Sequence, residues 1–310
     1  MPLLMRKLAV LAKLETAYGV DSTPTGAANA ILARNVAVTP IATVREARDL
    51  YRPYLGNSSN VIGAFYGQLR YEVEAAGGGA AGAIPGYGPL LRACAMAQVN
   101  TPGVNTVYTP VSQNFESIVQ YFYLDGVLHR FLGNRGDWGF RGSNRSATMF
   151  TFDFMGLFVP VADAVLPTAV YSGFVDPLAF NKANTPVFTI HGLTAQILRN
   201  FTFSMGNQVV YRNLVNSEAV RIVDRKPVGT LEMGAELMAT KNWFNTVRDA
   251  TTGNLVLEHG TVAGNIVAIS APALQLNELS YSAFEGDAML SASTKFMPLN
   301  GNDEFTLTVR

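Results

Sequence analysis

The chain has 310 residues, 48% of them hydrophobic and only 15% charged, a length that suits one large β domain or two domains of about 150 residues each. Its 23 lysines and arginines balance 23 aspartates and glutamates, so it lacks the basic excess of proteins that grip DNA or an anionic membrane. The single cysteine, Cys94, excludes an intramolecular disulfide and a metal site built on thiolates. So little charge indicates a small solvated surface and extensive subunit contacts.

The N-terminal segment 1–14 is apolar, but Arg6, Lys7 and Lys13 interrupt it and no convincing cleavage site follows, so a signal peptide is not predicted. No uninterrupted apolar run approaches about 18 residues, the length that a membrane span needs. We therefore expect a soluble protein that is made in a reducing cytoplasm and has no membrane partner.

Alternation of apolar and polar residues dominates the sequence and predicts many short strands. Asp125-Gly126 separates two apolar runs and predicts a hairpin, because this pair tolerates the positive φ of a tight turn. The expected strands are 68–75, 119–124, 127–132, 146–157, 187–191, 196–205, 229–237, 255–258, 265–270, 274–284, 288–296 and 304–309.

Helix signals are few and fall at 43–51, 87–98 and about 240–248. Pro89 suits the first turn of the second of these, where Leu90, Leu91, Cys94 and Ala97 follow at helical spacing. The fold class expected is mainly β with a few short helices, as a sandwich or barrel module.

The order of expected elements is similar in the two halves of the chain, each of which has a strand, a helix, a hairpin and a closing strand. The order favours a tandem duplication with a first module at 1–165 and a second at 166–310, and the boundary falls in the Pro- and Gly-rich stretch 159–186. Sequence identity between the halves is near chance, so a single domain covering 1–310 remains the alternative.

No group of residues predicts catalysis or a cofactor. The segment Gly77-Gly-Gly-Ala-Ala-Gly82 matches G-x-G-x-x-G, but no helix opens directly after it, so a flexible connection is favoured over a phosphate cradle. His129, His191 and His259 have no neighbours at metal-ligand spacing, and Cys94 fits a core position. We expect a protein that is not an enzyme and that holds no metal or cofactor.

Several segments, in the right order from Lys13 to Gly234, resemble a family of bacteriophage tail tube proteins. They are Lys13-Leu-Glu-Thr-Ala-Tyr-Gly-Val-Asp-Ser-Thr-Pro-Thr25, Glu72-Val-Glu-Ala-Ala-Gly-Gly-Gly-Ala-Ala-Gly82 with Tyr87-Gly-Pro-Leu-Leu-Arg-Ala-Cys94, Asn207-Gln-Val-Val-Tyr-Arg212 and Ile222-Val-Asp-Arg-Lys-Pro-Val-Gly229. The resemblance implies a β-sandwich flanked by a helix, with long loops and terminal arms.

What the resemblance implies about function is structural. Such subunits close into rings whose inner strands join into a continuous barrel, which leaves no sheet edge free. The rings have sixfold or pseudo-sixfold symmetry, so six copies are expected, or three if the duplication is real. The implied partners are other copies of the chain, the tape measure, tail terminator and tail tip proteins, and, transiently and without sequence preference, DNA in the lumen. The implied location is the tail of the virion, of the noncontractile kind by resemblance, after assembly in the host cytoplasm.

Three segments suit such an assembly. The loose apolar N-terminus suits an arm that orders on a neighbour, with Leu3, Leu4 and Leu8 as its contact residues. Glu72 and Glu74 share one face of a strand and are expected to line the lumen, where they would repel phosphates. A polar loop with an apolar tip is expected to insert into the next ring and comprises Gly56, Asn57, Ser58, Ser59, Asn60, Val61 and Ile62.

Two other functions remain open at this point. Another phage ring or capsid decoration protein would share the composition but would not form open-ended tubes. A β-sandwich that binds a ligand such as a carbohydrate would present a pocket of exposed aromatic residues, for which Tyr121, Tyr123 and Trp138 are the candidates.

Overall fold

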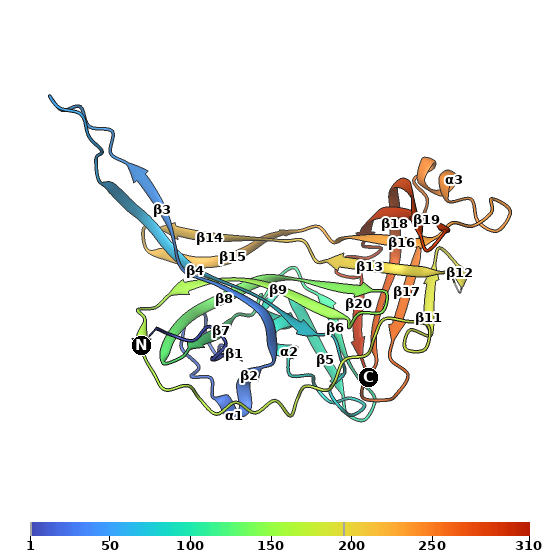
Figure 1. Cartoon of the computed structure of the whole chain (residues 1–310), viewed down its shortest axis with the longest axis horizontal. Helices are drawn as coiled ribbons and strands as arrows, with labels where there is room; N and C mark the ends of the chain where they lie inside the picture. The colour runs from blue at the N-terminus through green and yellow to red at the C-terminus, as the bar shows by residue number, and fades with distance from the viewer. Residues whose placement is uncertain (1, 195) are drawn as a thin grey trace.

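Antiparallel strands make up most of the chain in the computed structural model, which describes residues 2–194 and 196–310. Within these residues, eighteen strands are joined in one strongly curved sheet, and β14 (Asn207–Leu214) and β15 (Ser217–Arg225) form a separate hairpin. This hairpin lies across β8 and β9, and a second hairpin, β3–β4, projects from the body of the molecule (Figure 1). The mainly β fold class predicted from the alternation is confirmed.

In the first half of the chain, residues 2–165 contribute ten strands and two short helices. They are β1 (Leu8–Leu14), α1 (Gly26–Asn29), β2 (Ala30–Ile31), β3 (Ala33–Ala47), β4 (Asn60–Glu74), α2 (Gly88–Ala93), β5 (Met96–Thr101), β6 (Asn105–Pro110), β7 (Ile118–Leu124), β8 (Val127–Ser143), β9 (Met149–Phe158) and β10 (Ala162–Asp163). The β7–β8 turn is the predicted Asp125-Gly126 hairpin, and both of its residues have positive φ, 40° and 103°.

The second half follows a segment without strands at 164–186, which runs along the lower side of the molecule in Figure 1. Besides β14 and β15 it contains β11 (Val187–Ile190), β12 (Leu193–Thr194), β13 (Leu198–Ser204), β16 (Val228–Gly234), α3 (Trp243–Arg248), β17 (Thr252–His259), β18 (Val267–Phe284), β19 (Asp287–Met297) and β20 (Thr306–Val309).

The two halves repeat one order of strand pairing. In the first half the strands pair in the order β2–β1–β7–β8–β9–β4–β3, with β10 also on β8. In the second half the order is β12–β11–β17–β18–β19–β16–β13, with β20 also on β18. The β5–β6 hairpin is peculiar to the first half and the β14–β15 hairpin to the second. A helix, α2 or α3, occupies the same place in both sequences of elements.

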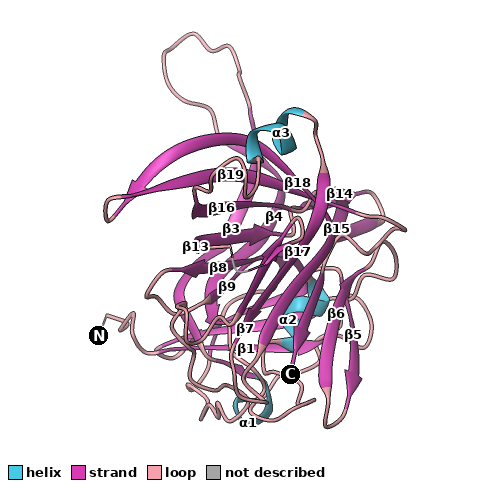
Figure 2. Cartoon of the chain, turned by 90° about the vertical axis from the view of Figure 1, so that its right-hand side faces the viewer, coloured by secondary structure: helices cyan, strands magenta, loops and turns pink. Residues whose placement is uncertain are grey.

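Pairing of β8 with β13 joins the halves. As a result, one face of the sheet runs through the strand order β3–β4–β9–β8–β13–β16–β19–β18, and Figure 2 shows β16, β13, β8 and β9 one below another. The halves also share an apolar core, in which the Phe203 ring lies 5.1 Å from that of Trp138 and 4.6 Å from that of Phe305. Alternation in β9 buries Phe150, Phe152 and Phe154 in this core, as expected from their spacing.

Two of the three expected helices differ from the prediction. Residues 43–47 belong to β3, because they pair with 60–65 of β4 in the projecting hairpin, so the helix predicted at 43–51 is wrong. The helix predicted at 87–98 ends at Ala93, and Met96 begins β5. The third, α3, lies within the expected range, and Asn242 caps it by accepting a hydrogen bond from the backbone N–H of Asn245.

Candidate functional site: the polar face of the curved sheet

The face of the long sheet that points away from the core carries mainly polar side chains. On β4 it begins with Arg70, Glu72 and Glu74, which alternate with side chains buried in the core. The neighbouring strands continue it with short hydroxyl and carboxylate side chains, namely Thr151, Asp153, Thr202, Thr230, Glu232, Ser291 and Ser293. A shallow depression of about 460 Å³ lies on this face between β13, β16, β18 and β19. Such a surface offers many weak polar contacts and no deep binding site.

Glu72 lies at the centre of a polar cluster in the first half. Its carboxylate accepts a hydrogen bond of 2.9 Å from the Asn35 side chain on β3 and lies 3.2 Å from Nε of Arg34. Arg141, which reaches across from β8, places Nη2 3.3 Å from the other carboxylate oxygen. Since Glu72 is only 18% exposed, these partners replace much of its hydration.

Glu232 on β16 has the same surroundings in the second half. Its two oxygens accept hydrogen bonds of 2.6 Å each from Arg199 and Asn200 on β13, and Ser282 on β18 donates another of 2.9 Å. Burial alone would raise the pKa of Glu232, but the hydrogen bonds from these three residues lower it below its ordinary value. The carboxylate is therefore held in its ionised form.

The two clusters occupy equivalent places. Each has an Arg-Asn pair at the start of β3 or β13, a glutamate on the paired strand β4 or β16, and a third donor two strands further on, on β8 or β18. In both halves the strand pairing shifts register next to the Arg-Asn pair, as a β-bulge does. Sequence reasoning found Glu72 but missed Glu232, whose signal was the repeated Arg-Asn pair at Arg34 and Arg199.

The polar face is charge-balanced. Glu72 is paired with two arginines, Asp153 with Arg70, and Glu232 with Arg199. These arginines lie on other strands of the face and are far from their partners in the sequence.

The expected inter-ring loop lies at the tip of the β3–β4 hairpin. Gly56, Asn57, Ser58 and Ser59 belong to the connection between the two strands, whereas Asn60, Val61 and Ile62 begin β4. Val61 and Ile62 are 49% and 57% exposed. The projecting hairpin thus carries exposed apolar side chains away from the body of the molecule (Figure 1).

The N-terminal residues divide into two parts. Leu8 begins β1 and pairs with Leu124 of β7, so it belongs to the sheet of its own chain. Leu3 and Leu4 precede β1 and are 47% and 55% exposed, and the backbone N–H of Leu4 donates to Asp125. Any arm that contacts a neighbour is therefore limited to the residues before β1.

The glycine-rich segment is used within the fold. The backbone N–H of Gly77 donates to the Asn265 side chain, and that of Gly79 donates to the carbonyl of Gly264. A Cβ atom on Gly77 would lie 2.0 Å from the Gly264 oxygen, so glycine is needed for this close approach. These N–H groups bind the β17–β18 connection and do not form a phosphate cradle.

The histidines and Cys94 lie in separate structural positions. His259 is buried, its Nδ1 lies 2.9 Å from the Thr185 hydroxyl, and its Nε2 lies 3.3 Å from the Leu178 carbonyl. Burial raises the pKa of the Cys94 thiol well above its ordinary value. In residues 2–194 and 196–310, no three His, Cys, Asp or Glu side chains come together as metal ligands would.

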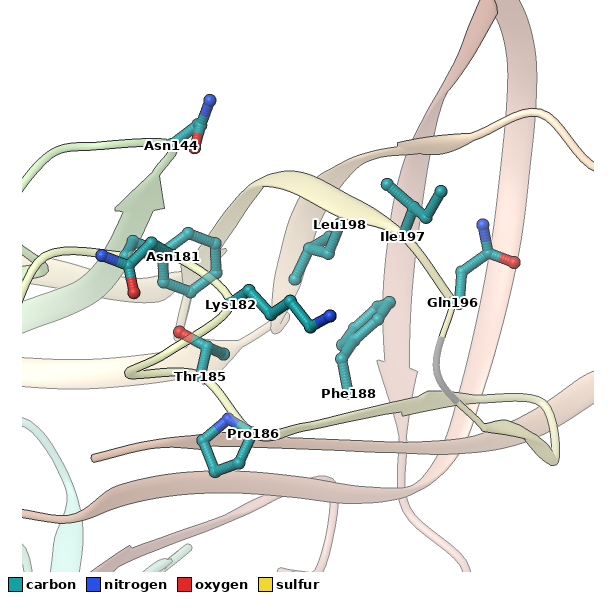
Figure 3. A pocket seen from close by; sticks show the side chains of 10 residues that line it. Asn144, Asn181, Lys182, Thr185, Pro186, Phe188, Gln196, Ile197 and Leu198 are labelled. Carbon is teal, nitrogen blue, oxygen red and sulfur yellow. The ribbon is translucent and has the colours of Figure 1, made fainter. Parts of the chain in front are cut away.

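The aromatic residues proposed for a ligand pocket do not form one, because Tyr121, Tyr123 and Trp138 are 8%, 9% and 1% exposed. A pocket of about 540 Å³ lies elsewhere, between β13 and the end of the segment 164–186. Lys182, Phe188 and Leu198 are among its lining residues (Figure 3). It contains none of the three aromatic candidates.

A comparison with known families gives the decisive observation. The family model of the phage tail tube protein matches residues 5–298, nearly the whole chain. The chain belongs to the phage tail tube protein family. It is therefore a structural component of the virion tail, and the resemblance seen in the sequence is confirmed. A search of curated proteins finds no match. No helix in the described part of this tail tube protein is long and apolar enough to cross a membrane.

Proposed function

We propose that this tail tube protein is a non-enzymatic subunit that closes into rings and that the rings stack into the tube that conducts DNA. The observation that carries the proposal is the continuous polar face that runs from β3 to β18, with the apolar core on its other side. Family membership supports the same role. A curved sheet of this kind lines a channel if neighbouring copies continue it at both edges.

The repeated order of strand pairing supports a tandem duplication within the chain. We place the first repeat within 1–165 and the second within 166–310, since β10 ends at Asp163 and β11 begins at Val187. A ring of six repeats, which the family resemblance implies, then takes three copies of the chain, in place of the six that an unduplicated subunit would need.

We infer that the polar face lines the lumen. Free basic side chains there would hold the phosphates of DNA, whereas the arginines of this face are engaged by Glu72, Asp153 and Glu232. Charge balance together with short hydroxyl side chains leaves little electrostatic attraction along the channel, so that DNA slides through. Glu74 belongs to the same face and keeps its proposed lumen position.

Stacking of rings is assigned to the projecting β3–β4 hairpin, whose tip contains Gly56–Ile62, and to the exposed Leu3 and Leu4. The hairpin supports this role because it carries exposed apolar groups beyond the body of the subunit. The tape measure protein would occupy the lumen during assembly in the host cytoplasm, and the tail terminator and tail tip proteins would bind the two ends of the tube.

Negative-stain electron microscopy of the purified protein at high concentration tests this function. We expect hollow tubes, or stacks of rings, of uniform bore. Closed rings that never stack would favour a capsid decoration or baseplate ring protein, and a protein that stays monomeric under all conditions would contradict the proposal.

A further inference from the structure

The junction between the two halves of the chain is a complete example of how one repeat joins the next. There β8 pairs with β13 so that Arg141 lies opposite Thr202 and Phe140 opposite Phe203. On the core side of this pairing, the Phe140 ring lies 5.9 Å from the ring of Phe201. Both backbone pairing and an apolar contact therefore hold the two repeats together.

The equivalent strands follow from the pairing registers. Glu72 lies opposite Thr151, and its equivalent Glu232 lies opposite Ser291. One strand further on, Thr151 pairs with Gly139 of β8, and Ser291 pairs with Ser280 of β18. Strand β18 therefore stands in the second repeat where β8 stands in the first, with Ser280 in the place of Gly139.

By the same correspondence, Tyr281 is the equivalent of Phe140, and Ser282 is the equivalent of Arg141. The donors around the two glutamates agree with it, since Arg141 binds Glu72 and Ser282 binds Glu232. Because β8 is joined by β13, the strand that would join β18 is the equivalent of β13.

That equivalent is β3. Its Arg34-Asn35 pair matches the Arg199-Asn200 pair of β13, and each pair binds the glutamate of the next strand. In this alignment Val36 and Val38 take the places of Phe201 and Phe203, the two phenylalanines at the junction.

Both of these edges are free in a single chain. Over the ranges 2–194 and 196–310, β3 pairs with β4 alone, and residues 276–284 of β18 pair with β19 alone. Tyr281 is 66% exposed, although its equivalent Phe140 is only 2% exposed. The missing neighbour of Tyr281 is thus one that Phe140 has within the chain, namely a strand of the next repeat.

We propose that β18 of one copy pairs with β3 of the next copy, antiparallel and in the register of the β8–β13 junction. In that register, Ser280 lies opposite Thr39 of the neighbouring copy, Ser282 opposite Ala37 and Phe284 opposite Asn35. Tyr281 covers Val36 and Val38 of the neighbour. This inference rests on the proposed ring and gives it a defined edge, a defined register and three copies for six repeats.

A double cysteine variant, Ser282→Cys with Ala37→Cys, tests the register. Directly opposite residues in a sheet have Cβ atoms about 5 Å apart, so a short bismaleimide joins the two thiols between copies. Cys94 is fully buried and stays in place as a background thiol. After treatment of the assembled protein, denaturing electrophoresis is expected to show cross-linked dimers and trimers, with no larger species.

The matched control is Ser282→Cys with Thr43→Cys, in which the second thiol lies six residues further along β3, about 20 Å away and out of reach of the reagent. Cross-linking of the control to the same extent would contradict the register. If tubes appear in the microscope but Ser282→Cys with Ala37→Cys is not cross-linked, the pairing of β18 with β3 is overturned. The proposed function is then left intact. Cross-linked species that extend to six chains would overturn the three-copy ring, and absence of rings and tubes would overturn the proposed function itself.

A second variant, Tyr281→Asp, tests the apolar contact. Tyr281 is 66% exposed in the single chain, and its ring lies 6.0 Å from that of Phe244 on α3. The variant is therefore expected to fold and to melt only slightly below the unassembled protein, yet to sediment as a monomer. Tyr281→Phe keeps the ring and is the control, expected to assemble normally. Assembly of Tyr281→Asp at the concentrations at which the unaltered protein assembles would contradict the proposed contact.

Discussion

At the scale of single residues, the two glutamates of the polar face hold neighbouring strands together. Glu72 and Glu232 each bind side chains from strands on both sides, and these contacts fix the spacing of the strands. The two carboxylates also neutralise the arginines that they bind. Alternation in the sequence correctly put Glu72 on the face away from the core. The partners could not be predicted in this way, since Arg141 is 69 residues away in the sequence.

Replacing Glu232 by alanine is expected to destabilise the fold by about 1–3 kcal/mol, because Arg199, Asn200 and Ser282 lose their common acceptor in a site that is only partly solvated. Urea denaturation measures the change. Asp249→Ala is the control: the Arg248–Asp249 pair is exposed, and we expect no measurable effect. Equal stabilities of the two variants would contradict the role given to the cluster.

Three histidines give the fold a pH dependence. Burial lowers the pKa of His129, His191 and His259, so the neutral form is favoured in the folded state. The unfolded chain binds more protons below its own histidine pKa of about 6.5, and the free energy of unfolding therefore falls as the pH drops below that value.

The variant His259→Gln isolates this effect. Urea denaturation at pH 7.5 and at pH 5.5 is expected to show a smaller loss of stability for His259→Gln than for the unaltered protein. The comparison is needed because burial raises the pKa of Asp137, which acts in the opposite direction. An identical loss in both proteins would show that His259 does not contribute.

At the scale of elements, close backbone contacts connect the two halves of the chain in addition to the pairing of β8 with β13. The glycine-rich segment after β4 packs against the β17–β18 connection, and Gly77 has no room for a side chain there. The sequence predicted a flexible loop, and the close approach could not be foreseen because the contacting residues lie in the other half of the chain.

Gly77→Ala is expected to cost about 1–3 kcal/mol or to prevent folding, since its Cβ would lie 2.0 Å from the Gly264 oxygen and 2.6 Å from the Asn265 Cα atom. Thermal unfolding measures the effect. Gly63→Ala is the matched control, because its Cβ would meet nothing nearer than the Val44 oxygen at 3.7 Å. A melting temperature of Gly77→Ala equal to that of the control would contradict the packing argument.

Strands with clear alternation, such as β9 and β19, were predictable from the sequence, and so was the β7–β8 hairpin with its Asp125-Gly126 turn. Strand β1 was not, because its run of buried residues lacks alternation and both of its faces are covered. Residues 43–47 have the charged and small residues of a helix, yet pairing with β4 decides their conformation. Local preference failed where a partner strand supplies the deciding hydrogen bonds.

At the scale of the whole molecule, the repeated order of strand pairing is clearer than any sequence likeness between the halves. Both halves contain a strand pair (β1–β2 or β11–β12), a helix (α2 or α3) and four strands of the polar face in the same order. An additional hairpin, β5–β6 or β14–β15, interrupts each half at a different place. The sequence predicts a boundary between two modules from the composition of 159–186, and this stays a prediction. It could not indicate that β8 and β13 join the halves into one face, because that pairing has no local signal.

Cryo-electron microscopy of the assembled tube would show which face of the sheet lines the lumen. We expect the face formed by β4, β9, β8, β13, β16 and β19 to line the lumen, with Glu72 and Glu232 at one radius and two such repeats in each chain. A reconstruction that places both glutamates on the outer wall or within an interface between subunits would contradict this expectation.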